Sequence, residues 1–432
     1  MRVLHTADWH LGRALEGRPR LDEQAAVLDE LCDLADQEAV DLVLVAGDVY
    51  DSVNPPAAAE ELFYATLERL SAGARGRPSA SPRPRPVVVI AGNHDNPDRL
   101  GAAGPLASRH GIALVGLPGA APGEPAPGPG APPVFRSGPG WVEVAAPGCP
   151  HEAVVLTLPY PSEARLGRAL REGLPLDDRE LQPAYSDQVA RLLGAAAGRL
   201  RPGAVRLVVA HLFAAGGLPS DSERPIQVGG AYTVSTGAFP AAAQYAALGH
   251  LHRPQAIPGP VPIRYCGSPL AYSFSEAGQT KGAVVVDLAP DRPAEVREVA
   301  LTRGRPLVVW RAAGGLPQVR AWAEAGRDRG AWIDLELHVD RPLGPAELQL
   351  LRGLPAEFVH IRPVLPAAEG TPEPEARRGL PVDELFGMFY RRVRGGDPPA
   401  TVARLFAALA AEEALPAAAA DPAVAAEEAV RP

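Results

Sequence analysis

Seven short, continuous apolar runs rich in Val, Leu and Ile recur over the first 290 residues. An apolar run without alternation is typical of a strand that is buried on both faces, as in the parallel sheets of α/β proteins. Between the first two runs, residues 21–35 place apolar side chains at helical spacing. The pattern predicts an α/β fold, with strands at residues 3–4, 42–46, 87–91, 154–158, 205–210, 245–248 and 283–286.

Proline and glycine contribute 49 and 44 of the 432 residues, roughly twice their usual share, so long loops must separate the folded parts. Two inserts, residues 71–86 and 119–140, are predicted to be exposed loops. The first insert enters its strand at the amino end, opposite the edge where α/β sites form, so a solvated loop is favoured over a polyanion contact. Its arginines are Arg75, Arg77, Arg83 and Arg85.

The pattern changes after Pro306, where strand, helix, strand, helix and strand follow one another up to Val364. This order predicts a small separate α/β unit at residues 300–364, beyond a core at residues 1–290. A linker at 365–380 and two amphipathic helices within 381–414 come next. The Ala-, Pro- and Glu-rich tail at 415–432 is predicted to be disordered.

Bulk composition excludes several classes of protein. The formal net charge is −9, and Lys281 is the only lysine among 42 basic residues, a skew that indicates coding bias rather than phosphate recognition. On charge alone, nucleic acid is not the expected partner. Three widely spaced cysteines argue against a disulfide scaffold. Without a signal pattern or an apolar run of ~20 residues, the chain is expected to be cytoplasmic and to have no membrane partner.

Residues of the kinds that bind metal ions follow five of the predicted strands. Because the carboxyl ends of parallel strands meet at one edge of a sheet, these residues are expected to converge. Carboxylate, amide oxygen and imidazole suit Mn, Fe or Zn, and seven candidate ligands suit two ions better than one. The clusters are Asp8-Trp9-His10, Gly47-Asp48, Gly92-Asn93-His94-Asp95, His211 and Gly249-His250-Leu251-His252.

Each motif alone also has a simpler interpretation. D-x-H and Gly-Asp occur by chance in many proteins, and His211 alone would be an ordinary strand-end histidine. The joint order, with every motif at a strand end, favours a metal centre. The five other histidines fit no cluster and are expected to be structural or surface residues, namely His5, His110, His151, His338 and His360.

The series D-x-H, G-D-x-x-D, G-N-H-D, a lone His and G-H-x-H resembles the calcineurin-like metallophosphoesterase superfamily. A finer resemblance, to the SbcD family of bacterial nuclease subunits, lies in residues 8–13, 47–51, 247–255, 267–270 and 272–274. The resemblance implies a metallophosphoesterase β-sandwich flanked by helices, with a small α/β capping domain and a C-terminal helical pair.

The resemblance also implies roles for individual residues. One Mn would be held by Asp8, His10, Asp48 and His252, and the other by Asp48, Asn93, His211 and His250. Two metal ions generate a hydroxide near neutral pH and neutralise charge on the entering and leaving oxygens of a phosphodiester. His94 would be the general acid or phosphate-charge stabiliser, and Asp51 the acidic partner that orients it.

The implied function is a Mn-dependent DNA nuclease of an SbcCD-type complex in DNA repair, recombination and replication. The activities would be 3′ to 5′ double-strand exonuclease and single-strand or hairpin endonuclease, carried out by a homodimer that is nucleoid-associated when on DNA. Helices as short as the C-terminal pair are marginal alone. The resemblance favours their binding an SbcC-like SMC-type ATPase over docking on their own core.

Two other functions use the same fold. A metallophosphoesterase that hydrolyses a small phosphodiester or a phosphoprotein would share all seven ligands, so the ligands do not discriminate. The capping unit and the terminal helices do, because a small-molecule hydrolase needs neither. A metal-free scaffold is disfavoured because every ligand position is filled.

Overall fold

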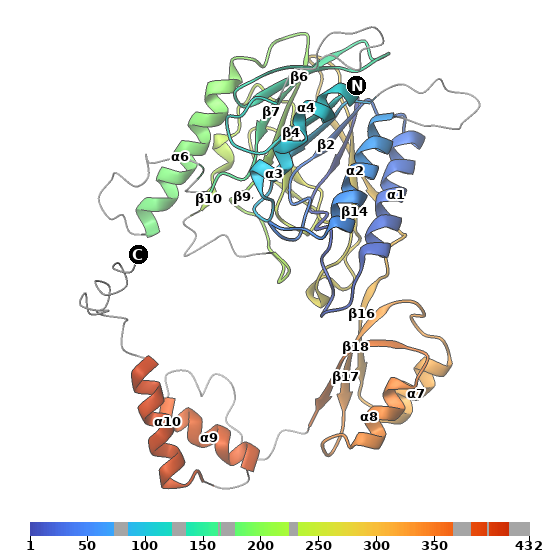
Figure 1. Cartoon of the computed structure of the whole chain (residues 1–432), viewed down its shortest axis with the longest axis vertical. Coiled ribbons are helices and arrows are strands. Elements are labelled where there is room, and N and C mark those ends of the chain that lie inside the picture. The colour runs from blue at the N-terminus through green and yellow to red at the C-terminus, as the bar shows by residue number, and fades with distance from the viewer. Residues whose placement is uncertain are drawn as a thin grey trace, which may run out of the picture. The chain divides into compact units, whose positions relative to one another are not determined.

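The computed structural model describes residues 1–72, 85–122, 135–162, 165, 178–223, 232–365, 382–394 and 397–413. The chain forms two compact units, Met1–Val364 and Leu365–Pro432. Figure 1 shows the sheets and helices of the first unit. Among the helices in these ranges, none is long and apolar enough to cross a membrane.

Two β-sheets form the centre of the first unit. The six-stranded sheet contains, in spatial order, β15 (Glu295–Ala300), β14 (Gly282–Asp287), β1 (Arg2–Thr6), β2 (Leu42–Val45), β3 (Val87–Ile90) and β4 (Ile112–Val115). The seven-stranded sheet contains β12 (Gln255–Ile257), β13 (Ile263–Tyr265), β11 (Tyr245–Gly249), β8 (Val205–His211), β7 (Glu152–Leu158), β6 (Trp141–Ala145) and β5 (Phe135–Gly138). Strands β1 to β4 are mutually parallel, as are β7, β8, β11 and β13.

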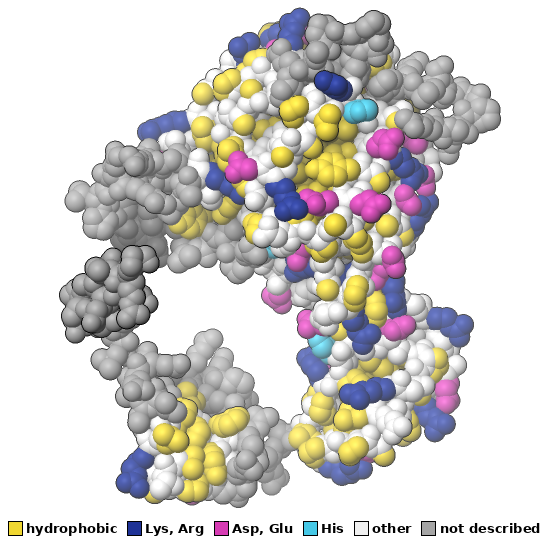
Figure 2. Space-filling view, in the orientation of Figure 1, with side chains coloured by type: hydrophobic (Ala, Val, Ile, Leu, Met, Phe, Trp, Pro, Cys, Tyr) yellow, Lys and Arg dark blue, Asp and Glu magenta, His cyan; other side chains and the backbone are white. Residues whose placement is uncertain are grey.

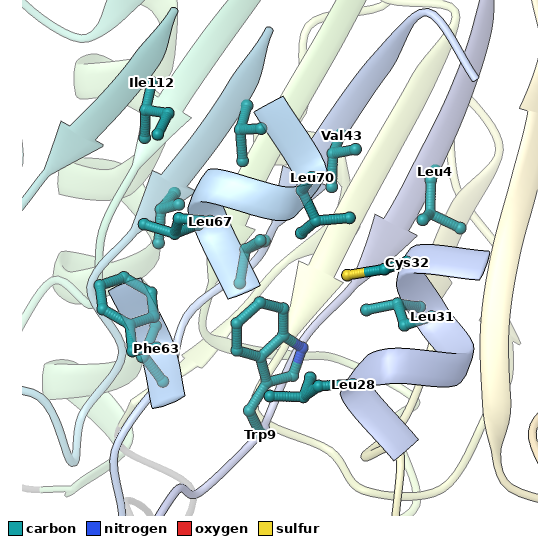
Figure 3. Close-up of a cluster of buried hydrophobic side chains, with 14 of the residues drawn as sticks. Leu4, Trp9, Leu28, Leu31, Cys32, Val43, Phe63, Leu67, Leu70 and Ile112 are labelled. Atoms are coloured by element: carbon teal, nitrogen blue, oxygen red, sulfur yellow. The ribbon is translucent and has the colours of Figure 1, made fainter. Parts of the chain in front are cut away.

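Helices cover the outer faces of both sheets. Helices α1 (Leu21–Gln37) and α2 (Ala57–Ala72) pack on the six-stranded sheet, and α6 (Asp178–Ala197) packs on the other. Figure 3 shows Leu31 of α1 and Leu70 of α2 directed toward Leu4 and Val43 of the sheet. The neighbouring Leu42 and Leu44 belong instead to the core between the two sheets. Both faces of β2 are therefore buried, which explains its unbroken apolar run.

The remaining elements of this unit are short. They are α3 (Pro97–Ala102), α4 (Gly104–Ala107), β9 (Phe213–Ala214), β10 (Thr233–Val234), and the 3₁₀ helices η1 (Ser108–His110), η3 (Thr236–Ala238) and η4 (Phe274–Glu276).

The predicted α/β sandwich is confirmed, and all seven predicted strands are present. One predicted loop is partly wrong, because β5 lies inside residues 119–140 and pairs antiparallel with β6. Its four residues follow a segment of Gly, Ala and Pro and show no run long enough to predict a strand. Residues 123–134 of this insert and 73–84 of the other lie outside the described residues.

Arg85 is expected from the sequence to lie in a solvated loop, but its side chain is buried and bonds to several segments of the first unit. Its side chain is only 6% exposed. Its guanidinium donates to the carbonyl oxygens of Val40, Leu70 and Ala35 at 2.8, 3.1 and 3.2 Å, and to Asp36 Oδ1 at 2.8 Å. A residue at the end of a basic, Pro-rich stretch carries no periodicity that would reveal this burial. Arg75, Arg77 and Arg83 lie outside the described residues.

Replacing Arg85 with methionine is expected to lower the free energy of unfolding by about 3 kcal/mol, because a partly buried carboxylate and three main-chain carbonyls lose their donor. Urea denaturation measures this change. Arg69→Met is the matched control, since Arg69 pairs with Asp29 and Asp33 on the surface and such pairs contribute at most about 1 kcal/mol. Equal losses in both variants would contradict the anchoring role.

A three-stranded parallel sheet occupies the end of the first unit. It consists of β16 (Leu307–Ala312), β17 (Trp332–His338) and β18 (Glu357–Val364), with helices α7 (Gly315–Glu324) and α8 (Pro345–Arg352). Trp310, Ile333 and Leu335 lie in a separate hydrophobic core. Trp332 faces the sandwich, where its Nε1 donates to Glu23 Oε1 at 2.9 Å. The strand and helix order is the one predicted from the sequence.

The second unit contains α9 (Val382–Arg394) and α10 (Ala400–Glu413). The rings of Phe386 and Phe406 stack with centroids 3.9 Å apart. Phe389 and Leu405 remain 61% and 63% exposed, and Figure 2 shows hydrophobic side chains gathered on this pair of helices. The predicted linker and tail fall almost entirely outside the described residues.

Candidate metal centre

The five predicted ligand clusters meet where the two sheets adjoin. The clusters at Asp8, Asp48 and Asn93 follow β1, β2 and β3 of one sheet, whereas His211 ends β8 and His250 follows β11 of the other. The main-chain N–H of His250 donates to Asp8 Oδ1 at 3.0 Å, and His211 Nδ1 lies 2.9 Å from the Ala46 carbonyl oxygen. Both sheets of the sandwich therefore contribute ligands to the site. The sequence-based expectation of convergence at one sheet edge accounts for only part of it.

Among the described residues, three groups of buried side chains have their ligand atoms within 4.8 Å of one another, and one of them, His10, Asp48 and His94, shares residues with the other two. Of those two, the first group is Asp8, His10 and His252, and the second is Asp48, His211 and His250. Asp48 Oδ2 lies 3.6 Å from His10 Nε2 and 3.5 Å from His211 Nε2, so it is placed between the groups.

Asn93 joins the second group. Its Oδ1 is 2.9 Å from His211 Nε2 and 3.1 Å from His250 Nδ1. All seven residues predicted as ligands thus come together in one place.

The facing imidazole nitrogens of the site suit a metal ion. The Nε2 atoms of His10 and His252 face each other at 2.9 Å. Within the described ranges, His10 Nδ1 and Asn93 Nδ2 are buried without a hydrogen-bond partner, which is uncommon in folded proteins. Burial lowers the pKa of His10 to about 3 and also lowers the pKa of His211 and His250. Neutral imidazole is the form that binds metals.

Two buried carboxylates also favour a cation. Burial raises the pKa of Asp8 well above its usual value, and the nearby charge of Asp48 raises it further. Burial alone would raise the pKa of Asp48 too, but His211, His10 and His94 outweigh that effect and lower it. A divalent cation between two such carboxylates offsets both the burial and the repulsion. The carboxylate and imidazole ligands of the site therefore fit divalent metal ions.

The backbone is strained at these loops. Positive φ angles of 54°, 44°, 48° and 110° occur at Asp8, His10, Asp48 and His250, half of the eight described non-glycine residues with positive φ. Each costs about 1–3 kcal/mol and persists where surrounding structure enforces it. Such concentration at four candidate ligands is typical of a functional site.

Two glycines permit the close approach of the loops. A Cβ at Gly92 would lie 2.0 Å from Asp48 Oδ1, and one at Gly249 would lie 1.9 Å from the Ala46 carbonyl oxygen. Only glycine fits at either position, as expected for the glycines beside the clusters.

His94 is held rigidly beside the ligands. Its main-chain N–H donates to Asp48 Oδ1 at 2.9 Å, and its Nδ1 lies 2.7 Å from the main-chain carbonyl oxygen of Asp51. The Asp51 carboxylate is farther away, with Oδ1 3.9 Å from His94 Nδ1 and 3.6 Å from His10 Nδ1. Asp51 thus meets His94 through its main chain, whereas the family resemblance implies an acidic side chain in that role.

Several residues that support the ligands have no role predicted from the sequence. The Asp95 carboxylate accepts N–H bonds from Gly92, Tyr50 and Val49 at 2.8, 2.9 and 3.2 Å, which ties two ligand loops together. Glu223 Oε1 accepts the N–H of His252 at 2.7 Å. Asp95 stands inside the G-N-H-D motif, but no pattern in the sequence points to Glu223.

Comparison with known proteins identifies the family. Residues 1–122 match the calcineurin-like phosphoesterase family. The SbcD subunit of the SbcCD nuclease of Bacillus subtilis strain 168 is 45% identical over 412 residues, which cover 95% of this chain and 98% of that protein. The same subunits from Rhodobacter capsulatus and Escherichia coli K12 are 34% and 29% identical, and the matches cover 90% and 91% of this chain and 94% and 92% of theirs. The chain therefore belongs to the SbcD family of nuclease subunits, metal-dependent phosphodiesterases with a calcineurin-like phosphoesterase domain.

Proposed function

We propose that this chain cleaves DNA phosphodiester bonds at a centre of two Mn ions. The observation that carries the proposal is the position of Asp48, which lies within 3.6 Å of a histidine from each ligand group. A carboxylate so placed can bridge two ions. Bound there, the ions would supply a hydroxide near neutral pH and neutralise charge on the phosphodiester.

The ligand assignments follow from the two groups. Asp8, His10, Asp48 and His252 would hold one ion, and Asp48, Asn93, His211 and His250 would hold the other. His94 donates its Nδ1 proton to the Asp51 carbonyl, which leaves Nε2 to hold or release a proton. His94 would serve as general acid or phosphate-charge stabiliser, and Asp51 would orient it.

DNA is favoured over a small phosphodiester or a phosphoprotein because a capping unit and two terminal helices follow the metal centre along the chain. A small-molecule hydrolase needs neither. Residues 1–290 would form the nuclease core, and residues 300–364 a capping domain that positions DNA. A linker at 365–380 would lead to a partner-binding segment at 381–414 and a disordered tail at 415–432. The reactions would be 3′ to 5′ exonucleolytic cleavage of duplexes and endonucleolytic cleavage of single strands or hairpins.

One assay tests this function. The purified chain with Mn is given linear duplex DNA, hairpin DNA or bis-p-nitrophenyl phosphate, with and without the ATPase partner. Cleavage of both DNA substrates is the expected result. Activity confined to the small ester would instead support the alternative phosphodiesterase.

The helical pair of the second unit would bind the coiled-coil root of an SbcC-like SMC-type ATPase in the cytoplasm. The relatives are named as subunits of a nuclease called SbcCD. Exposed Phe389 and Leu405 offer an apolar surface for a partner helix. The functional form would be a homodimer of this chain with that ATPase.

Deleting residues 383–413 is expected to abolish co-purification with the ATPase and to spare Mn-dependent cleavage by the chain alone, because all seven ligands lie in the first unit. Pull-down and nuclease assays on the same preparation measure the two effects. A Phe389→Ser, Leu405→Ser variant, which removes only apolar contacts, should likewise lose binding. Retained ATPase binding by the deletion would contradict this assignment.

A further inference from the structure

The chain's only lysine lies directly behind the first ligand group. Lys281 is 8% exposed, and its Nζ donates to the main-chain carbonyl oxygen of His252 at 2.8 Å and to Ser268 Oγ at 3.1 Å. The same ammonium forms an ion pair with Glu276. All 41 other basic residues are arginine, so lysine here is a local requirement. A compact ammonium with three donors fits between these acceptors, whereas a planar guanidinium needs a wider space.

Glu276 connects this lysine to the other histidine of the group. Glu276 is fully buried, and its Oε1 accepts the N–H groups of Tyr272 and Ser273 at 3.2 and 3.1 Å. The Tyr272 hydroxyl donates to the carbonyl oxygen of Trp9, the residue before His10. The Tyr272 ring also packs edge-on against both imidazoles, with centroids 5.4 Å from His10 and 5.8 Å from His252.

We propose that Lys281 is a positioning residue for the metal-binding group formed by Asp8, His10 and His252. Its ammonium fixes the main chain of His252, which places the imidazole opposite His10 Nε2. This inference rests on the proposed two-metal centre. Loss of Lys281 weakens metal binding at this group and spares the group of Asp48, His211 and His250, which Lys281 does not contact.

A purely structural ion pair makes a different prediction. In that case, removing both charges together would restore the fold and metal binding alike, because no unpaired buried charge remains. In the positioning role, the carbonyl of His252 still lacks its donor after both charges are removed. Two double variants separate these roles. The first combines Lys281→Met with Glu276→Gln, and the second combines Lys281→Gln with Glu276→Gln. Both double variants remove the two charges, but only the second retains an N–H donor at position 281.

The test is Mn titration of the metal-free full-length chain, followed by electron paramagnetic resonance and calorimetry, with circular dichroism as the check of folding. In the Met variant, the affinity for one of two ions should fall about 10- to 100-fold, as is usual when a supporting partner of a ligand is lost. The Gln variant should recover much of that loss. Arg320→Met, Glu324→Gln on α7, an exposed ion pair, is the matched control and should bind Mn as the wild type does.

Two results would overturn the inference. If the folded Met variant binds both ions with wild-type affinity while the wild type binds two, only the role of Lys281 is wrong. If the wild-type chain takes up no Mn, the proposed metal centre itself is wrong, and the inference falls with it.

Discussion

An Asp48→Asn variant is expected to lose both metal ions and all detectable phosphodiester cleavage while keeping its fold. Asp48 lies between the two ligand groups, so its charge serves both. The loss of affinity for each ion should exceed the roughly 10- to 100-fold cost of losing a supporting partner. Asparagine preserves the shape and tolerates the positive φ of 48° at this position. The substitution is therefore expected to leave the backbone conformation at position 48 unchanged.

Elemental analysis and calorimetry measure the bound metal, and cleavage of duplex DNA with Mn measures the activity. Asp291→Asn is the matched control. Asp291 also has a positive φ, of 60°, but it is exposed and pairs only with Arg206 among the described contacts. Asp291→Asn should retain two ions and full activity. An Asp48→Asn protein that still binds two ions would contradict the bridging role.

Much of this centre was predictable because its ligands stand at the ends of apolar runs. The ends of strands can be located in the sequence. Because the carboxyl ends of parallel strands meet at one edge of a sheet, five ligand clusters at such ends are expected to lie close together. The contribution of two sheets was not visible, because a buried apolar run looks the same in either sheet. His211 shows this limit: it ends β8 in the seven-stranded sheet yet lies 2.9 Å from Ala46 of the other.

The supporting residues were not predictable, because their roles depend on contacts between distant segments. Arg85 and Lys281 are both buried cations that donate to main-chain carbonyls of other segments, Arg85 to Val40 and Leu70 and Lys281 to His252. Every residue has a main-chain carbonyl oxygen, so the identity and spacing of residues do not show which carbonyls accept these hydrogen bonds. The same reason explains Asp51, whose carbonyl rather than its carboxylate contacts His94.

His94→Gln is expected to keep both metal ions and to lower kcat by about 10³-fold, within the range that a positioned proton donor contributes. His94 also lies within ligand distance of His10 and Asp48, but the groups of Asp8, His10 and His252 and of Asp48, His211 and His250 are complete without it. Its main-chain N–H to Asp48 survives the substitution. Glutamine can still donate to the Asp51 carbonyl but cannot deliver a proton near neutral pH. Elemental analysis and single-turnover cleavage test the two parts separately, and loss of metal would contradict this division of roles.

Asp51→Asn is the comparison that shows which part of Asp51 matters. Its main-chain carbonyl, 2.7 Å from His94 Nδ1, is unchanged by the substitution, whereas its carboxylate lies 3.9 Å from that nitrogen. The variant is therefore expected to lose less than about 10-fold in kcat, far below the loss in His94→Gln. A loss as large as that of His94→Gln, with metal content intact, would mean that the carboxylate orients the histidine during catalysis. A small loss would mean that the main chain alone holds His94 in the orientation it needs to transfer a proton.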